Sequence, residues 1–132
     1  EMDVLVMAAA VADYRPVTVA SDKIKKKDGD LSIPVERTAD ILGTIGPRKT
    51  KQFLCGFSME TRDMVENSAA KLKKKNLDMV VANNLKVSGA GFGVDTNVVT
   101  FITPDGTREL PLMSKADVAD AILDEILKRR GH

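Results

Sequence analysis

The segment Phe53–Ala82, FLCGFSMETRDMVENSAAKLKKKNLDMVVA, decides the fold. Phe53–Phe57 and Leu77–Ala82 are short, mostly apolar runs, typical of strands buried on both faces of a sheet. The residues between them, from Thr61 or Arg62 to Lys75, predict a helix whose closing lysines suit the negative end of its dipole. Its expected inward side chains are Met64, Val65, Ala69 and Leu72. A strand, a helix and a strand in this order predict a parallel pair joined by a crossover.

Further elements are predicted before this unit. Val4–Ala10 predicts a buried parallel strand that is kept narrow at its end by alanines. Residues 17–37 are polar with an Asp-Gly turn signal, and predict an exposed flap. Thr38 predicts the N-cap of a short helix, which Gly46-Pro47 ends. The apolar side chains of that helix are Ile41, Leu42 and Ile45.

The C-terminal part predicts a hairpin and a last helix. Residues 98–112 form the hairpin, with Val98–Ile102 and Arg108–Leu112 as its strands. Ser114–Asp117 resembles a capping box and opens the helix. One face of this helix is expected to carry Val118, Ala119, Ile122, Leu123 and Ile126. The Gly-rich loop Ser88–Asn97 lacks the glycine spacing of a phosphate-binding motif.

Together these elements predict one domain over residues 1–132, with an α/β, Rossmann-like, three-layer fold and a mainly parallel sheet. Ligands of such sheets bind beyond the C-terminal ends of the strands. That rule directs attention to the segments that follow Ala10, Phe57 and Ala82.

Composition excludes several classes of function. A formal charge of +1 favours neither nucleic acid nor a membrane surface, so any anion site must be local. The single Cys55 fits a reducing compartment, and we expect a cytoplasmic protein. The single histidine, His132, makes a zinc site improbable. Cys55 lies within an apolar run with no histidine nearby, which predicts a packed thiol and not a nucleophile.

A few polar residues have two readings each. Asp13 follows a strand end, where it either holds a ribose hydroxyl or Mg²⁺, or forms a turn with its own backbone. The lysines of Lys23–Lys27 either cover a polyphosphate or form a solvated loop. Lys71 and Lys75, spaced i,i+4, either bind an anion or complement the helix dipole. Phe57 either stacks on a base or caps the core.

Sequence motifs then narrow the choice. AAAVADYRP at residues 8–16, KIKK at 23–26, GFSMET at 56–61 and NLDMVVAN at 76–83 resemble the phosphopantothenoylcysteine synthetase family in order and spacing. GFGVDTN at 91–97 also resembles it, so that the likeness covers nearly the whole chain.

The resemblance implies a two-step ligation in coenzyme A synthesis. CTP, with Mg²⁺, activates the carboxylate of 4′-phosphopantothenate as an acyl-cytidylate and releases pyrophosphate; the cysteine amine then displaces CMP. In many bacteria this synthetase is the C-terminal half of a bifunctional protein, and FMN belongs to the fused decarboxylase half. Family members are generally homodimers.

The resemblance also assigns residues. Lys23 matches the essential lysine, and Asp13 is the position that would share in Mg²⁺ binding. The start of the first helix, from Thr38 to Leu42, is expected to offer backbone N–H groups to the ligand. Ala39 stands where family members commonly have proline. The positions implied to contact CTP are Met7, Ala8, Ala9, Asp13, Lys23, Ala39, Asp40, Ile41, Leu42, Phe57, Lys71 and Lys75.

The family also has a Gly-rich strand–helix segment ahead of AAAVADYRP that this sequence does not contain, so these 132 residues alone are expected to show little or no ligase activity. Two other functions remain open at this point. One is a different nucleotide-binding domain, of NAD(P) type. The other is a non-catalytic module in which hairpin 98–112 pairs with a second copy.

Overall fold

The computed structural model describes residues 2–25, 29–60, 63–84 and 93–131. Its centre is a five-stranded sheet in the order β1-β4-β5-β7-β8. The first three strands of that order are parallel, and β7 and β8 continue the sheet antiparallel. The strands are β1 (Val4–Met7), β4 (Phe53–Glu60), β5 (Met79–Asn84), β7 (Val99–Thr103) and β8 (Gly106–Glu109).

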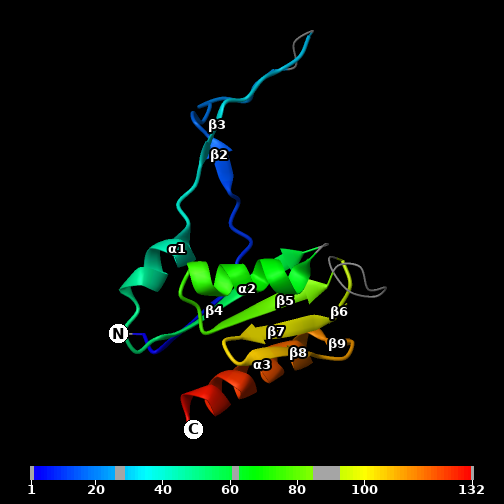
Figure 1. Cartoon of the computed structure of the whole chain (residues 1–132). Helices are drawn as coiled ribbons and strands as arrows, with labels where there is room; N and C mark the ends of the chain where they lie inside the picture. The colour runs from blue at the N-terminus through cyan, green and yellow to red at the C-terminus, as the bar shows by residue number, and fades with distance from the viewer. Residues whose placement is uncertain (1, 26–28, 61–62, 85–92, 132) are drawn as a thin grey trace.

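Two helices cover the sheet, one on each face (Figure 1). Alternation along the strands sends Met79 and Phe101 toward α3 (Lys115–Arg130), and Val80 and Ile102 toward α2 (Met64–Lys74). Each face therefore has its own buried cluster. The predicted three-layer α/β fold is confirmed, and a hairpin extends the sheet. Its second strand is Gly106–Glu109 and not the predicted Arg108–Leu112, because Thr103 already pairs with Gly106 and the turn is shorter than expected.

An arm projects away from these layers (Figure 1). Its base is the antiparallel pair β2 (Tyr14–Pro16) and β3 (Val35–Arg37), all of whose residues are exposed. The arm corresponds to the predicted flap, although Lys26, Lys27 and Asp28 at its far end lie outside the described residues. A second short pair, β6 (Thr96–Asn97) with β9 (Met113–Ser114), lies before α3.

The first strand is shorter and less buried than its composition predicts. β1 ends at Met7 and Ala8–Ala10 are exposed, so the prediction of a strand buried over Val4–Ala10 was wrong. The reason is position: β1 lies at the edge of the sheet and pairs with β4 alone among the described strands.

The helix faces also differ in part from the prediction. Val65 is 43% exposed, and Ser68 takes the buried position on α2. On α3, Ala119 and Leu123 point outward while Glu125 is buried. Glu125 is accommodated because Arg108 and Arg129 donate to its carboxylate at 3.0 and 2.7 Å.

The helix between the arm and β4 begins later than predicted. Asp40, not Thr38, caps α1 (Ile41–Ile45), its carboxylate accepting from the Gly43 N–H at 2.9 Å. Thr38 instead joins the two ends of the arm, donating from its hydroxyl to the Ala12 carbonyl and from its N–H to the Asp13 carbonyl. At Gly46 the helix passes into the short 3-10 turn η1 (Gly46–Arg48).

Gly46 permits a close contact between two elements. A Cβ at this position would lie 1.9 Å from the Lys75 carbonyl oxygen, so no other residue fits without movement. The Asn76 side chain also donates to the Gly46 carbonyl at 2.9 Å. This contact fixes α1 and η1 against the C-terminal end of α2.

Candidate functional site

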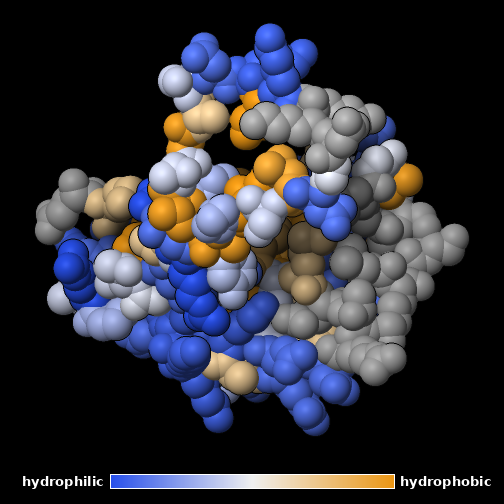
Figure 2. All heavy atoms as spheres, turned by 90° about the horizontal axis from the view of Figure 1, so that it is seen from above, coloured by the Kyte–Doolittle hydropathy of each residue, from blue (hydrophilic) through white to orange (hydrophobic). Residues whose placement is uncertain are grey.

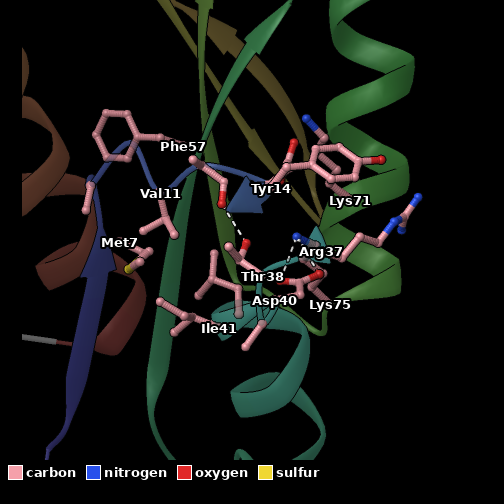
Figure 3. A pocket seen from close by; sticks show the side chains of 15 residues that line it. Met7, Val11, Tyr14, Arg37, Thr38, Asp40, Ile41, Phe57, Lys71 and Lys75 are labelled. Atoms are coloured by element: carbon pink, nitrogen blue, oxygen red, sulfur yellow. Dashed lines mark hydrogen bonds and ion pairs between the residues drawn. The ribbon is translucent and has the colours of Figure 1, made fainter. Parts of the chain in front are cut away.

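A cavity of about 470 Å³ lies beyond the C-terminal end of β1 and beside Phe57 in the second half of β4, bounded by α1, α2 and the base of the arm (Figure 3). This is the edge at which ligands of parallel sheets bind. Many of the residues expected at a nucleotide site line it: Met7, Ala9, Asp13, Ala39, Asp40, Ile41, Leu42, Phe57, Lys71 and Lys75.

One side of the cavity is apolar. Met7, Val11, Ile41 and Phe57 stand there in Figure 3. Phe57 is half-buried and also packs against the core on the α3 face, so its two readings are compatible. The Leu42 side chain reaches the sheet because Gly56 has no Cβ, which would otherwise lie 3.0 Å from it.

The other side is cationic. The i,i+4 spacing of Lys71 and Lys75 places both on the face of α2 that borders the cavity (Figure 3). Lys71 Nζ donates to the Ser58 hydroxyl at 3.0 Å, and Ser58 is itself buried. Lys75 Nζ lies 3.0 Å from both carboxylate oxygens of Asp40.

Asp40 therefore has two partners. The hydrogen bond from the Gly43 backbone, and then that from Lys75, holds the pKa of Asp40 below its ordinary value. The carboxylate remains ionised near neutral pH. It occupies the Gly43 N–H, a backbone donor at this helix start, where the sequence predicts open N–H groups for a ligand.

Tyr14 and Arg37 also line the cavity, and the sequence reasoning missed both. They are opposite each other in the β2–β3 register, and the Arg37 guanidinium lies 5.9 Å from the centre of the Tyr14 ring. The available signal was their place in the sequence, since Tyr14 directly follows Asp13 and Arg37 lies two residues before Ala39, both expected ligand contacts.

Two expected residues are not at the cavity. Ala8 and Lys23 do not line it, and Lys23 is exposed in the part of the arm beyond β2. Its predicted role requires the arm to bring it to a ligand.

Cys55 is a buried free thiol. Burial first, and the Asp78 carboxylate second, raise the pKa of its thiol to about 12. Asp78 accepts from the Leu54 N–H at 2.7 Å and from Lys49 at 2.9 Å, which braces β4 against the start of β5.

Within the described ranges there is no cluster of three or more His, Cys, Asp or Glu suited to a metal ion. None of the described helices is long and apolar enough to cross a membrane.

With this geometry established, the chain can be compared with known proteins. Residues 1–129 match the family model described as the DNA/pantothenate metabolism flavoprotein C-terminal domain. The chain belongs to this family.

Two curated relatives match almost the entire chain. It is 50% identical over 125 residues to the coenzyme A biosynthesis bifunctional protein CoaBC of Bacillus subtilis (strain 168), covering 94% of this chain and 31% of that protein. It is 44% identical over 129 residues to a cysteine/cysteine sulfinic acid decarboxylase of an unknown prokaryotic organism, covering 96% and 36%. The chain thus spans about a third of these relatives.

Solved structures agree on the fold. The C-terminal domain of a CoaBC protein superposes with a TM-score of 0.72 at 42% identity, covering 94% of this chain and 53% of that one. The Cab2 mutant H337A in complex with phosphopantothenate-cysteine gives a TM-score of 0.73 at 19% identity, covering 97% and 44%, which shows likeness of fold.

Proposed function

We propose that this chain is the nucleotide-handling part of a cytoplasmic, CTP-dependent phosphopantothenate–cysteine ligase of coenzyme A biosynthesis. Its relatives named for coenzyme A biosynthesis support the pathway, since the 50% identity extends over nearly the whole chain. The observation that carries the proposal is the cavity itself, which has an apolar side and a cationic side at the ligand-binding edge of the sheet.

This arrangement suits a nucleotide. Met7 and Phe57 offer apolar contact to a base or ribose, while Lys71 and Lys75 lie where an anionic group would be neutralised. The Asp40–Lys75 pair supplies a hydrogen-bond acceptor and a donor side by side. Such a pair can bind polar atoms of the base or ribose as well as those of the anionic group.

In the proposed reaction, the phosphopantothenate carboxylate attacks the α-phosphorus of CTP and pyrophosphate leaves. The cysteine amine then attacks the acyl carbon, an amide bond forms, the amine loses a proton and CMP leaves. Asp13 at the cavity fits Mg²⁺, which is often held through one or two carboxylates plus substrate phosphates. That ion would neutralise charge on the triphosphate. Lys23, carried in by the arm, would add positive charge at the same group.

Thermal unfolding with added nucleotides tests this proposal against an NAD(P)-type domain. We expect CTP with Mg²⁺ to raise the midpoint more than ATP or NADPH at equal concentration, because a ligand stabilises the state that binds it. A larger shift with NADPH would favour the dinucleotide alternative.

We further propose that the protein forms a homodimer, and the arm provides the better surface for it. Val19, Ile24 and Leu31 on the arm are 90%, 60% and 68% exposed. Figure 2, viewed from the side on which the arm projects, shows orange apolar side chains among blue charged ones. Hairpin 98–112 offers less, since β7 is buried inside the sheet.

Light scattering of the chain and of a Val19→Asp/Leu31→Asp variant tests this surface. We expect a dimer that the two added charges convert to monomers, because apolar contact would be replaced by buried charge. If the variant stays dimeric, the arm is not the dimer surface, and the exposed edge strand β8 becomes the next candidate.

A further inference from the structure

Arg37 carries an unneutralised charge at the rim of the cavity. Among the described residues its guanidinium makes no hydrogen bond and no ion pair. The guanidinium carbon Cζ lies over the Tyr14 ring, 5.9 Å from the ring centre. Arginine can present five N–H donors in a planar fork, so this group has its full donor capacity available.

The ladder at the base of the arm directs Arg37 to the cavity. Tyr14 pairs with Arg37, and the next pair is Arg15 with Glu36. Successive side chains on a strand point to opposite faces, so Tyr14 and Arg37 line the cavity. Arg15 and Glu36 lie on the other face of the ladder and form an ion pair with an N···O distance of 2.8 Å. Thr38, hydrogen-bonded to the Asp13 carbonyl, holds the end of β3 in this position.

The neighbouring charges leave Arg37 uncompensated. Asp40 is paired with Lys75, and Glu36 is paired with Arg15. Asp13 also lines the cavity, and it makes no ion pair with Arg37 among the described residues. In Figure 3, Tyr14, Arg37, Lys71 and Lys75 lie toward the α2 side of the view, and Met7 and Phe57 lie toward the opposite side. A nucleoside placed against the apolar side would direct its phosphate chain toward Arg37, whose fork matches phosphate oxygens in a bidentate manner.

We propose that Arg37 is a specificity-determining residue that binds the phosphates beyond the α-phosphate of the nucleotide, with Tyr14 holding its guanidinium in place. This rests on the proposed nucleotide function of the cavity. Because the guanidinium stacks on Tyr14, the arginine side chain is already partly ordered, so it loses less conformational entropy when it binds phosphate. The stacking also contributes cation–π attraction. The pair thereby distinguishes a nucleoside triphosphate from a monophosphate.

Calorimetric titration of the chain with CTP and with CMP tests this inference. We expect Arg37→Gln to weaken CTP binding by about tenfold, the value for one charge-assisted hydrogen bond, and to change CMP binding by less than about twofold. Arg37→Lys should restore only part of the CTP affinity, since it keeps the charge and loses the fork. Tyr14→Leu should act in the same direction as Arg37→Gln, more weakly.

Arg15→Gln is the matched control, since it removes an arginine from the same ladder on the opposite face and should leave both affinities unchanged. Unchanged CTP affinity in Arg37→Gln, or an equal loss for CTP and CMP, would overturn the inference. The ATP and AMP pair is titrated as well. If wild type prefers ATP, the proposed cytidine specificity fails, yet the triphosphate-to-monophosphate ratio still decides the role of Arg37.

Discussion

Single residues at the cavity serve the fold and the site together, and Asp40 is the clearest case. Its carboxylate caps α1 through the Gly43 N–H and holds Lys75. Threonine and aspartate are both favoured at N-caps, so residue type alone does not decide between Thr38 and Asp40. The hydrogen bonds that commit Thr38 to the arm join residues 26 and 25 positions apart in the chain, Ala12 and Asp13, and no local pattern reveals them.

Asp40→Asn should separate these two roles. Asparagine also caps helices but lacks the charge that holds Lys75, so Asp40→Asn should lose the contribution of the ion pair at neutral pH, and Asp40→Ala should lose about 1 kcal/mol more with the cap. The pKa of Asp40 is lowered on folding, so its contribution is complete above the unfolded pKa and disappears as pH falls through the folded pKa. Urea unfolding across that acidic range should show wild type converging on Asp40→Asn. Parallel pH profiles for the two proteins would contradict this account.

Cys55 yields a second prediction at this scale. With its pKa raised to about 12 by burial and Asp78, the native thiol should resist iodoacetamide near neutral pH and react only after unfolding in urea. Mass spectrometry of the alkylated chain measures this. Rapid labelling of the native protein would show that β4 is more accessible than its burial indicates.

At the scale of elements, the sequence predicts which segments are strands and helices better than it predicts their faces. The βαβ unit was recognisable because two apolar runs flank a helical pattern. The face of α3 was misjudged because Glu125 has no apolar character, and its burial depends on Arg108 from the hairpin and on Arg129. Such long-range pairing cannot be inferred from helical spacing alone.

The contact between η1 and α2 provides a prediction for elements. Gly46 has an ordinary helical φ of −52°, so Gly46→Ala costs nothing in backbone conformation. Its Cβ would nevertheless meet the Lys75 carbonyl at 1.9 Å, and we expect a loss of about 3 kcal/mol with weaker nucleotide binding.

Gly56→Ala is the comparison for that experiment. Its Cβ would meet only flexible tips of Leu42 and Leu77 at 3.0 Å, so the loss of stability should be smaller. Chemical denaturation measures both variants. Equal stability of Gly46→Ala and wild type would mean that α1 is not held against α2 as described.

At the scale of the whole molecule, the rule that ligands bind beyond parallel strands correctly indicated the segment after the first strand, since residues 11–14 line the cavity. Described residues that follow the other two indicated positions, 58–59 and 83–84, do not line it. The rule could not show that the β2–β3 pair closes one side of the cavity and adds Tyr14 and Arg37 to it. That pairing brings together Pro16 and Val35, which lie 19 residues apart in the chain. Nor could the rule show that Lys23 would lie away from the cavity.

The central claim is that a nucleotide binds with its phosphates against the cavity face of α2. Calorimetric titration of CTP into a Lys71→Gln/Lys75→Gln variant tests it most directly. Lys73→Gln/Lys74→Gln is the matched control, because these exposed lysines lie on the same helix and do not line the cavity. We predict that the first variant loses about 100-fold in affinity, as two charge-assisted contacts would, and that the control changes by less than about twofold. Equal losses in the two variants, or no loss in the first, would contradict the account.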